Sequence, residues 1–471
     1  MRYISTRGEA PALGFIDVTL AGLARDGGLY VPESWPVFSS GQISRMAGRP
    51  YAEIACEVVR PFVGGAIPDA EISHMAHDAY GSFRHPAVAP LAQLSPGTFV
   101  LELFHGPTLA FKDLAMQFLA RLMDYALIQR GERSTIVVAT SGDTGGAAVE
   151  AFRGSNQVDV IALYPHGRIS DVQRRMMTTQ AEPNVYALAI EGTFDDCQAI
   201  VKGLFNHHGF RDRVRLSGVN SINWARIVAQ VVYYFTAAVA LGAPHRKVAF
   251  TVPTGNFGDV FAGYVAMRMG LPIERLVVAT NVNDILVRTL NTGTYEVRGV
   301  TATASPSMDI QVSSNFERLL FEASRRDAAG VRRLMDQLKQ SGRFVLPDAT
   351  LAAVREEFDA GRADETETAA AIRAAWREAG DLVDPHTAVA LAVADRDTSD
   401  SRIPNIVLST AHAAKFPDAV EAACGVRPQL PAWLDGLLTK SEHMTVMKND
   451  SAEVERFVQS VSRAARQGVA G

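Results

Sequence analysis

The sequence predicts an α/β protein in which parallel sheets are covered by helices on both faces. Between about residues 98 and 290, short apolar and often β-branched runs alternate with longer helical patterns. This alternation is typical of βαβ units, whose strands pair in parallel. Two of these runs are followed directly by loops rich in glycine and hydroxyl residues. At 471 residues the chain exceeds a single hydrophobic core, so we expect two or three domains.

The chain begins with a region rich in loops, residues 1–95. Glycine and proline interrupt it repeatedly, and helical patterns lie near 50–60 and 69–83. We predict an N-terminal accessory region here. Because the first eight residues lack the apolar core of a signal peptide, we expect a cytoplasmic protein.

The alternating region supplies most of the predicted elements. The predicted strands are short apolar runs at 135–140, 158–164, 184–190, 247–252 and 275–281. The predicted helices lie between and around them, at 112–129, 144–153, 170–181, 194–208, 223–241 and 259–269. This order predicts parallel strands with helices on both faces of the sheet.

A charge-rich helical region follows, at about 315–396. Its predicted helices are 315–340, 347–360, 364–379 and 385–395. The run 405–410 then predicts one more buried strand, which ends in two hydroxyl residues, and the polar tail has one helical stretch. We therefore place a central region made of two α/β subdomains at 96–430, with residues 315–396 as a helical insertion, and a C-terminal extension at 431–471.

Composition excludes several classes of function. The net charge is −5 with both signs spread along the chain, so we expect neither nucleic acid nor a membrane surface as a partner. No stretch of about 18 uncharged apolar residues predicts a membrane span. Cys56, Cys197 and Cys424 lie far apart, which indicates reduced thiols and no metal site.

Lys112 is the most informative single residue. It is a lone lysine in the segment 101–127, with apolar or small residues on both sides. Loss of hydration favours its neutral amine, and a neutral lysine amine is a nucleophile for aldehydes. The alternative is a lysine in a first helical turn that extends to solvent beside Asp113.

Two loops downstream favour the chemical interpretation. Residues 140–146 (TSGDTGG) and 254–259 (TGNFGD) each lie between a predicted strand and a predicted helix. This layout points backbone N–H groups at an anion, although plain turn chemistry would also explain either loop alone. Together with Lys112, the loops predict a phosphorylated ligand. Residues 142–146 also resemble a serine-protease nucleophile sequence with threonine in place of serine, but the alternating strands and helices argue against that hydrolase fold.

Seven segments spread over nearly the whole chain carry a resemblance to a known family. They are 26–32 (DGGLYVP), 105–113, 140–146, 220–226, 254–259, 305–321 (SPSMDIQVSSNFERLLF) and 410–416. In this order they resemble threonine synthases of the branch typical of many bacteria and fungi. The glycine loops fit several pyridoxal-phosphate enzymes of the tryptophan-synthase-β-like fold, whereas the first and sixth segments are narrower signals.

The resemblance implies three-layer parallel-sheet domains of that fold, fold type II, and pyridoxal 5′-phosphate as cofactor. It also implies the last step of threonine biosynthesis. In that step a carbon–oxygen lyase acting on phosphates converts O-phospho-L-homoserine and water to L-threonine and phosphate, by γ-elimination and β-hydration. Two alternatives stay open. One is another lyase of the same fold, such as a threonine dehydratase, and the other is a synthase-like binding protein without catalysis.

The cofactor residues follow from the same resemblance. Lys112 resembles the family's Schiff-base lysine, whose free amine would move protons at Cα, Cβ and Cγ. The cofactor-phosphate loop corresponds to Thr254, Gly255, Asn256, Phe257 and Gly258. Thr410 resembles the hydroxyl partner of the pyridine nitrogen, with Ser409 as the alternative, unless Thr410 is an ordinary strand-end threonine.

The substrate residues are read in the same way. Asn220, Ser221 and Arg226 are implied to hold the substrate's phosphate, because an arginine fork binds oxyanions bidentately. The alternative for this segment is a helix N-cap followed by a surface arginine. Ser141 and Thr144 are expected to hold substrate phosphate or carboxylate from the opposite loop.

Three assignments stay open at this stage. Asp143 occupies a position where many relatives of the fold carry an asparagine that donates to the cofactor's phenolic oxygen. An ionised carboxylate cannot donate, so Asp143 is either protonated or contacts something else. His105 and His412 lie beside functional motifs and are as readily structural as catalytic, and the assembly is expected to be a monomer or homodimer.

Overall fold

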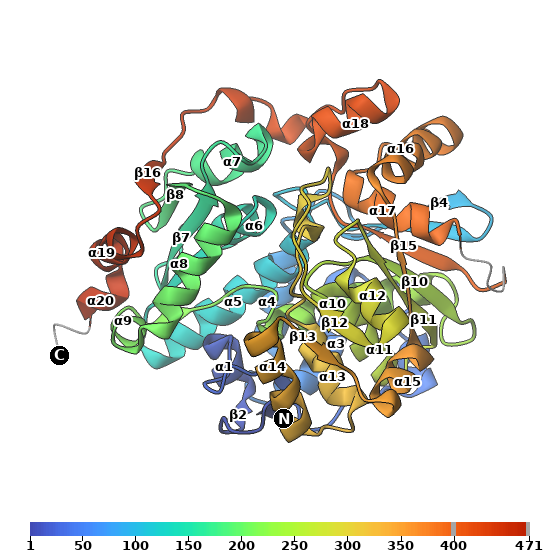
Figure 1. Ribbon diagram of the computed structural model, residues 1–471, viewed down its shortest axis with the longest axis horizontal. Coiled ribbons are helices and arrows are strands. Elements are labelled where there is room, and N and C mark those ends of the chain that lie inside the picture. The colour runs from blue at the N-terminus through green and yellow to red at the C-terminus, as the bar shows by residue number, and fades with distance from the viewer. Residues whose placement is uncertain (397–401, 468–471) are drawn as a thin grey trace.

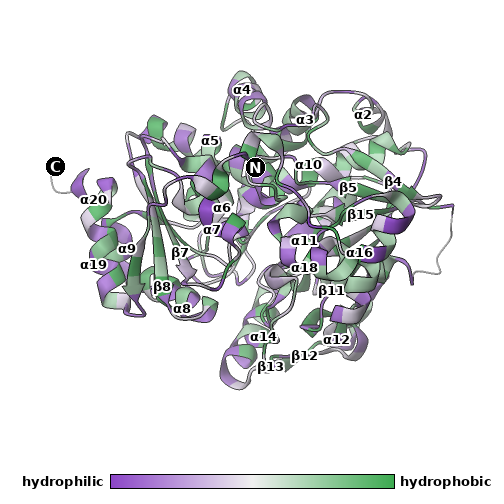
Figure 2. Cartoon of the chain, turned by 90° about the horizontal axis from the view of Figure 1, so that it is seen from above, coloured by the Kyte–Doolittle hydropathy of each residue, from purple (hydrophilic) through white to green (hydrophobic). Residues whose placement is uncertain are grey.

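The computed structural model describes residues 1–396 and 402–467 and contains two large sheets at opposite ends of the molecule (Figures 1 and 2). The first sheet has the order β16-β8-β7-β6-β9, and all of its pairs are parallel. Its strands are β6 (Ser134–Ala139), β7 (Val158–Pro165), β8 (Val185–Glu191), β9 (Leu216–Ser217) and β16 (Thr445–Lys448). The predicted strands of this half are confirmed, but β16 comes from the tail and was not predicted.

The second sheet has the order β14-β11-β10-β15-β5-β4. Its strands are β4 (Leu91–Ser95), β5 (Thr98–Glu102), β10 (Val248–Pro253), β11 (Ile273–Thr280), β14 (Phe358–Arg362) and β15 (Asn405–Ser409). All neighbours pair in parallel except β4 and β5, which form an antiparallel pair. β15, close to the C-terminal end of the chain, lies between β5 and β10.

Both sheets are three-layered because their strands alternate apolar side chains between two faces. In the first sheet, Ile136 and Val138 pack with α5 (Lys112–Arg130) and α6 (Asp143–Phe152), while Val137 packs with α8 (Phe194–Asn206). In the second sheet, one face meets α10 (Trp224–Ala240) and α11 (Gly258–Arg268), and the other meets α17 (Pro385–Ala394). The predicted fold class is confirmed.

The N-terminal residues pack directly against the second half of the molecule. Their elements are β1 (Arg2–Ser5), β2 (Leu13–Gly14), α1 (Phe15–Ala21), β3 (Tyr30–Pro32), α2 (Ser40–Ser44), α3 (Tyr51–Val63) and α4 (Asp69–Tyr80). The rings of Tyr3 and Phe62 each lie 5.8 Å from the ring of Trp224 on α10. One continuous core therefore joins this region to the two sheets.

The helix predicted at 315–340 is wrong. The structure has two helices there, α13 (Phe316–Ala323) and α14 (Ala328–Ser341). Arg325 and Arg326 take left-handed backbone conformations, with φ of 55° and 64°, which no helix interior accepts. A tertiary contact fixes this break, because the guanidinium of Arg326 lies over the rings of Trp35 and Phe321 and donates to the carbonyl of Pro32.

The helix predicted at 347–360 ends early, at α15 (Asp348–Glu357), because the next residues form β14 against β11. The helix at 194–208 is likewise divided at His207, and α9 (His208–Arg213) follows. The remaining elements are α7 (Asp171–Thr178), α12 (Ile285–Thr292), β12 (Thr294–Glu296), β13 (Arg343–Val345), α16 (Glu365–Ala379), α18 (Pro417–Cys424), α19 (Ser451–Val461) and α20 (Arg463–Gln467), with short 3₁₀ turns. Within residues 1–396 and 402–467, no helix combines the length and apolar character that crossing a membrane requires.

Candidate active site

Lys112 is the first residue of α5, and its amine faces Asp143, at the start of α6, and Ser307. Its Nζ is 3.4 Å from Asp143 Oδ2 and 3.5 Å from Ser307 Oγ, and its side chain is only 12% exposed. Burial lowers the pKa of Lys112, the nearby cations Lys415 and Arg226 lower it further, and Asp143 opposes them. The interpretation of Lys112 as a lysine extending to solvent is therefore wrong.

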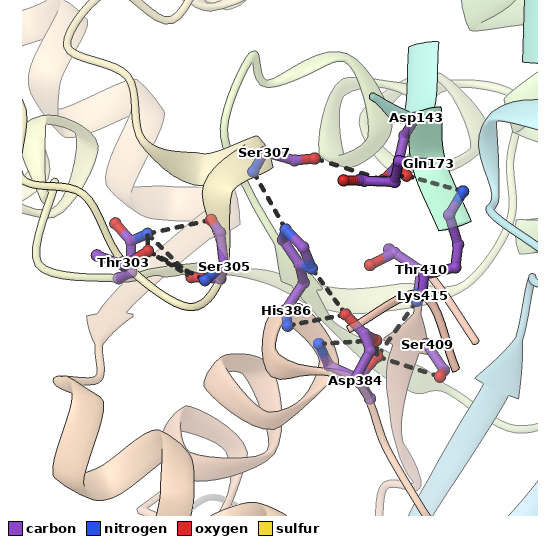
Figure 3. A network of polar contacts seen from close by, with 12 residues as sticks. Asp143, Gln173, Thr303, Ser305, Ser307, Asp384, His386, Ser409, Thr410 and Lys415 are labelled. Atoms are coloured by element: carbon purple, nitrogen blue, oxygen red, sulfur yellow. Dashed lines mark hydrogen bonds and ion pairs between the residues drawn. The ribbon is translucent and has the colours of Figure 1, made fainter. Parts of the chain in front are cut away.

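Asp143 is an ionised partner of lysines. Its Oδ1 lies 2.8 Å from Lys415 Nζ and accepts a hydrogen bond from Gln173 Nε2 at 2.9 Å (Figure 3). Its Oδ2 faces Lys112 at 3.4 Å. Burial opposes ionisation of this carboxyl, but the ammonium groups of Lys415 and Lys112 outweigh it and hold its pKa well below the usual range. Of the two options for Asp143, the structure favours contact with another group.

The loop before α6 is shaped by one hydroxyl and one strained glycine. Thr140 Oγ1 accepts hydrogen bonds from the N–H groups of Gly142 and Gly145, both at 2.9 Å. Gly142 has φ of +129°, and a Cβ there would lie 2.5 Å from the side chain of Gln173. Ser141 and Thr144 are partly buried, and their hydroxyls make no hydrogen bond within the described chain. The loop therefore leaves both hydroxyls free for a ligand.

The second loop leaves several backbone donors open. Residues 255–258 make no hydrogen bond through their N–H groups to any described residue, although they lead into α11. Phe257 takes φ of 62°, and its buried ring packs on Phe316 and Phe358. A Cβ on Gly255 would lie 2.8 Å from the carbonyl of Ser307. Open N–H groups at a helix N-terminus fit a phosphate.

The other loop residues hold its shape. The Thr254 hydroxyl donates to the carbonyl of Val252 at 2.7 Å. The Asn256 carbonyl accepts a hydrogen bond from the N–H of Asn315 at 3.0 Å, and the Asn256 side chain is exposed. Thr254 and Asn256 therefore fix the backbone that a phosphate would contact.

Thr410 follows β15 and is tied to the lysine helix. Its carbonyl accepts a hydrogen bond from the N–H of Phe111 at 2.8 Å, and its own N–H donates to Thr387 Oγ1. Its hydroxyl has no hydrogen-bond partner among the residues that the structure describes. The Ser409 hydroxyl, in contrast, lies 3.1 Å from Thr387 Oγ1. Of the two hydroxyls, that of Thr410 is the free one.

Arg226 is buried, so the alternative of a surface arginine is wrong. It is 2% exposed, its Nη1 donates to the carbonyl of Val219 at 3.2 Å, and its Nε has no partner among the described residues. Burial lowers the pKa of Arg226 to about 10, against the opposing effect of Tyr233 and Asp259. No carboxylate pairs with this guanidinium in the described part of the chain.

Of the residues before Arg226, Asn223 caps a helix and Ser221 lies beside the second loop. Asn223 is the N-cap of α10, as the cap interpretation predicted, and it also donates to the carbonyls of Thr19 and Gly218. Ser221 lies against the loop of residues 255–258, because a Cβ on Gly258 would be 3.6 Å from the Ser221 Cβ. Asn220 is half-buried, and no side-chain contact ties it to the other candidates in the described structure.

Sequence reasoning gave no role to several residues beside Lys112. Ser307 Oγ lies 3.5 Å from Asp143, and its N–H donates to His386 Nε2 at 3.2 Å (Figure 3). His386 Nδ1 in turn lies 2.7 Å from Asp384 Oδ1. Asp384 caps α17 and Pro385 is its first residue, a typical helix start that could have drawn attention to this segment.

The two motif histidines sit in structural hydrogen bonds. His105 Nε2 lies 2.6 Å from Glu102 Oε2. His412 Nδ1 accepts the N–H of Ala414 at 3.1 Å. Burial and the neighbouring His105 lower the pKa of His412 to about 4, so it is neutral near pH 7.

Comparisons with known proteins agree along the whole chain. The model of the pyridoxal-phosphate-dependent enzyme family matches residues 85–409, the model of the threonine synthase N terminus matches 2–80, and that of the threonine synthase C-terminal region matches 387–458. A threonine synthase of Pseudomonas aeruginosa is 53% identical over 459 residues, which cover 97% of this chain and 98% of that protein.

Solved structures give the same result. A PLP-bound threonine synthase from Brucella melitensis is 62% identical and superposes with a TM-score of 0.96, covering 98% of this chain and all of that one. The yeast enzyme is 38% identical, with a TM-score of 0.92 and 98% of each chain covered. The chain belongs to the threonine synthase family of pyridoxal-phosphate-dependent enzymes.

Proposed function

We propose that this protein converts O-phospho-L-homoserine and water to L-threonine and phosphate with pyridoxal 5′-phosphate as cofactor. One juxtaposition carries the proposal. The amine of Lys112, which burial favours in its neutral form, lies near a guanidinium, Arg226, that is buried without a carboxylate partner in the described chain. A covalent amine and a separate anion site together suit a phosphorylated amino acid.

The chain's own residues fit the cofactor. Lys112 would take the aldehyde end, the open N–H groups of residues 255–258 would take the phosphate, and the free hydroxyl of Thr410 would face the pyridine nitrogen. When bound, pyridoxal phosphate supplies an electron sink that acidifies the substrate's carbon-bound protons. A neutral hydroxyl at the nitrogen moderates that sink, which suits elimination and replacement.

The substrate's two anionic ends need separate donors. We assign its phosphate to Arg226 with Asn220 and Ser221, since an arginine fork matches a phosphate oxyanion. The free hydroxyls of Ser141 and Thr144 would hold the substrate from the opposite loop. Lys112, buried and with a lowered pKa, would move protons at the substrate's Cα, Cβ and Cγ.

The test is phosphate release from O-phospho-L-homoserine by the purified holoenzyme, with L-threonine identified as product. Lys112→Ala should abolish turnover. Turnover of phosphate-free L-threonine to an oxoacid without phosphate release would favour the dehydratase alternative. A cofactor-loaded protein that turns over neither compound would favour the binding protein.

The proposal also covers the two flanking regions, the cellular compartment and the assembly. The accessory region at 1–95 and the C-terminal extension at 431–471 would flank the catalytic region, although the last four residues of that extension lie outside the described structure. We infer a cytoplasmic enzyme that acts as a monomer or homodimer.

A further inference from the structure

Lys415 is a buried lysine with no role in the proposed reaction. It ends the 3₁₀ turn Ala413–Lys415 and is 1% exposed. Its Nζ donates to the carbonyl of Thr108 at 2.7 Å and pairs with Asp143 Oδ1 at 2.8 Å. An ammonium taken out of water this completely is costly unless it is paired, so the pairing with Asp143 defines what Lys415 does.

The two oxygens of the Asp143 carboxylate face different lysines. Oδ1 is held by Lys415 and by Gln173, and Oδ2 is thereby left facing Lys112 at 3.4 Å. Two short contacts on one oxygen fix the rotation of the carboxylate. Together with Gln173, Lys415 therefore sets which way Asp143 points, although no hydrogen bond or ion pair joins Lys415 to Lys112 in the described structure.

The balance of charge around Lys112 depends on the same pair. Asp143 favours the protonated amine, whereas Lys415 and Arg226 favour the neutral one. The other titratable groups near Lys415 are Asp113 and His412. Without Lys415, only Arg226 would offset the effect of the Asp143 carboxylate on Lys112. The amine of Lys112 would then hold its proton more tightly.

We propose that Lys415 is a positioning residue for Lys112: it orients Asp143 and offsets its charge, so that Lys112 can give up its proton near neutral pH. The inference rests on the proposed function, because it concerns the same amine. It also gives Asp143 a role that suits an ionised carboxylate, which accepts hydrogen bonds and donates none.

The test compares Lys415→Met with the parent enzyme, with Lys415→Arg as the charge-conserving variant. In Lys415→Met, the acidic limb of kcat/KM for phosphate release should move to higher pH by about one unit, as expected when a nearby like charge is removed. Lys415→Arg should move it less. Lys247→Met, which removes an exposed lysine paired with Glu274, is the matched control and should leave it unchanged.

Two readouts do not depend on turnover. The pH at which the bound cofactor's absorption band changes should move in the same direction. The pH dependence of the rate at which the apoprotein takes up pyridoxal phosphate should also move to higher pH, because uptake requires the neutral Lys112 amine. A structural role alone would lower thermal stability without moving either midpoint.

A double variant keeps the inference testable if Lys415→Met folds poorly. Asp143→Asn with Lys415→Met removes both charges of the pair and should return the midpoints towards those of the parent. Unchanged midpoints in Lys415→Met, or equal shifts in the single and double variants, would overturn the inference. Failure of the parent enzyme to release phosphate would instead count against the proposed function.

Discussion

At the scale of single residues, the burial of Arg226 makes its guanidinium a candidate binding group for an anion. Its guanidinium is 2% exposed, its Nε is unpaired, and no carboxylate of the described chain forms an ion pair with it, so the site suits a bound anion. Charge-assisted hydrogen bonds are each worth roughly 1.5–3 kcal/mol. Arg226→Ala should therefore lower kcat/KM for O-phospho-L-homoserine on the order of 10²-fold or more.

Part of that loss should appear in kcat, because the phosphate that we assign to Arg226 is also the leaving group. Arg226→Lys should restore activity only weakly, since it offers a point charge without the planar fork. Steady-state kinetics and the cofactor absorption band are the measurements. Near-normal kinetics in Arg226→Ala would show that Arg226 does not hold the substrate's phosphate. Loss of the cofactor would show that Arg226 has been assigned to the wrong phosphate.

Thr410 gives a second residue-scale prediction. Its free hydroxyl would face the pyridine nitrogen, and a carboxylate there would keep that nitrogen protonated. Thr410→Asp should change the cofactor's absorption spectrum, lower the rate of threonine formation at least ten-fold (about 1.4 kcal/mol) and widen the side products. Thr410→Ser keeps the hydroxyl and should behave like the parent. An unchanged spectrum and pure threonine from Thr410→Asp would remove Thr410 from this role.

The residues that sequence reasoning found and missed differ in a physical way. Lys112 and the glycine loops were predictable, because a lone lysine among apolar residues and a strand–loop–helix layout are local patterns. Ser307 and Gln173 were not, because their role comes from contacts with Asp143 made across the fold. Lys415 lies in one of the segments that carry the family resemblance. Its partner Asp143 begins α6, far away in the sequence, so the local pattern could not show the pair.

At the scale of elements, Glu442 ties the C-terminal tail to α7. Its carboxylate meets Arg174 Nε at 2.8 Å, Arg175 Nη2 at 3.3 Å and the Thr178 hydroxyl at 2.7 Å. Hydrogen bonds from Arg174 lower the pKa of Glu442 to about 2. Because the ordinary pKa is about 4.3, the stabilisation is complete above that pH and is lost as pH falls from about 4 to 2.

Glu442→Gln should therefore reduce the free energy of unfolding at pH 7 by roughly 1–2 kcal/mol after allowance for solvent screening. The difference from the parent should shrink below pH 4 and vanish near pH 2, as measured by urea unfolding. Glu421→Gln, which removes one partner of the exposed Arg427, should cost little at any pH. A difference that persists undiminished at pH 2 would contradict the ionic origin.

Elements were predictable where local pattern and fold agree. The strands and helices of the alternating region were found to within a few residues, because the continuous apolar runs there reflect strands buried on both faces. The break after α13 and the strand β14 were not, since each depends on a distant partner. Arg326 is held by the segment around Trp35, and β14 is defined by its pairing with β11.

At the scale of the molecule, the C-terminal extension completes the first sheet. β16 pairs with β8, Arg463 Nε lies 2.6 Å from Asp159 Oδ1, and Met447 and Val454 join the core beneath α8. A chain that ends at residue 430 should lose on the order of 5 kcal/mol of stability, since each buried apolar side chain contributes about 1.5–3 kcal/mol.

The truncated chain should also aggregate, because it exposes the edge of β8. Thermal unfolding and light scattering would measure both effects, with a chain ending at residue 467 as the control. A truncated protein that stays monodisperse and melts with the parent would show that the extension is dispensable for the fold.

The position of β15 between β5 and β10 has a consequence for how the protein is made. Strand β5 leaves the ribosome with β4 beside it, but its other neighbour, β15, begins only at Asn405. Residues 103–404 must be synthesised first, which at roughly 5–20 residues per second takes on the order of 15–60 s. During that interval the nascent chain carries an open strand edge, which β15 closes only after it has been made.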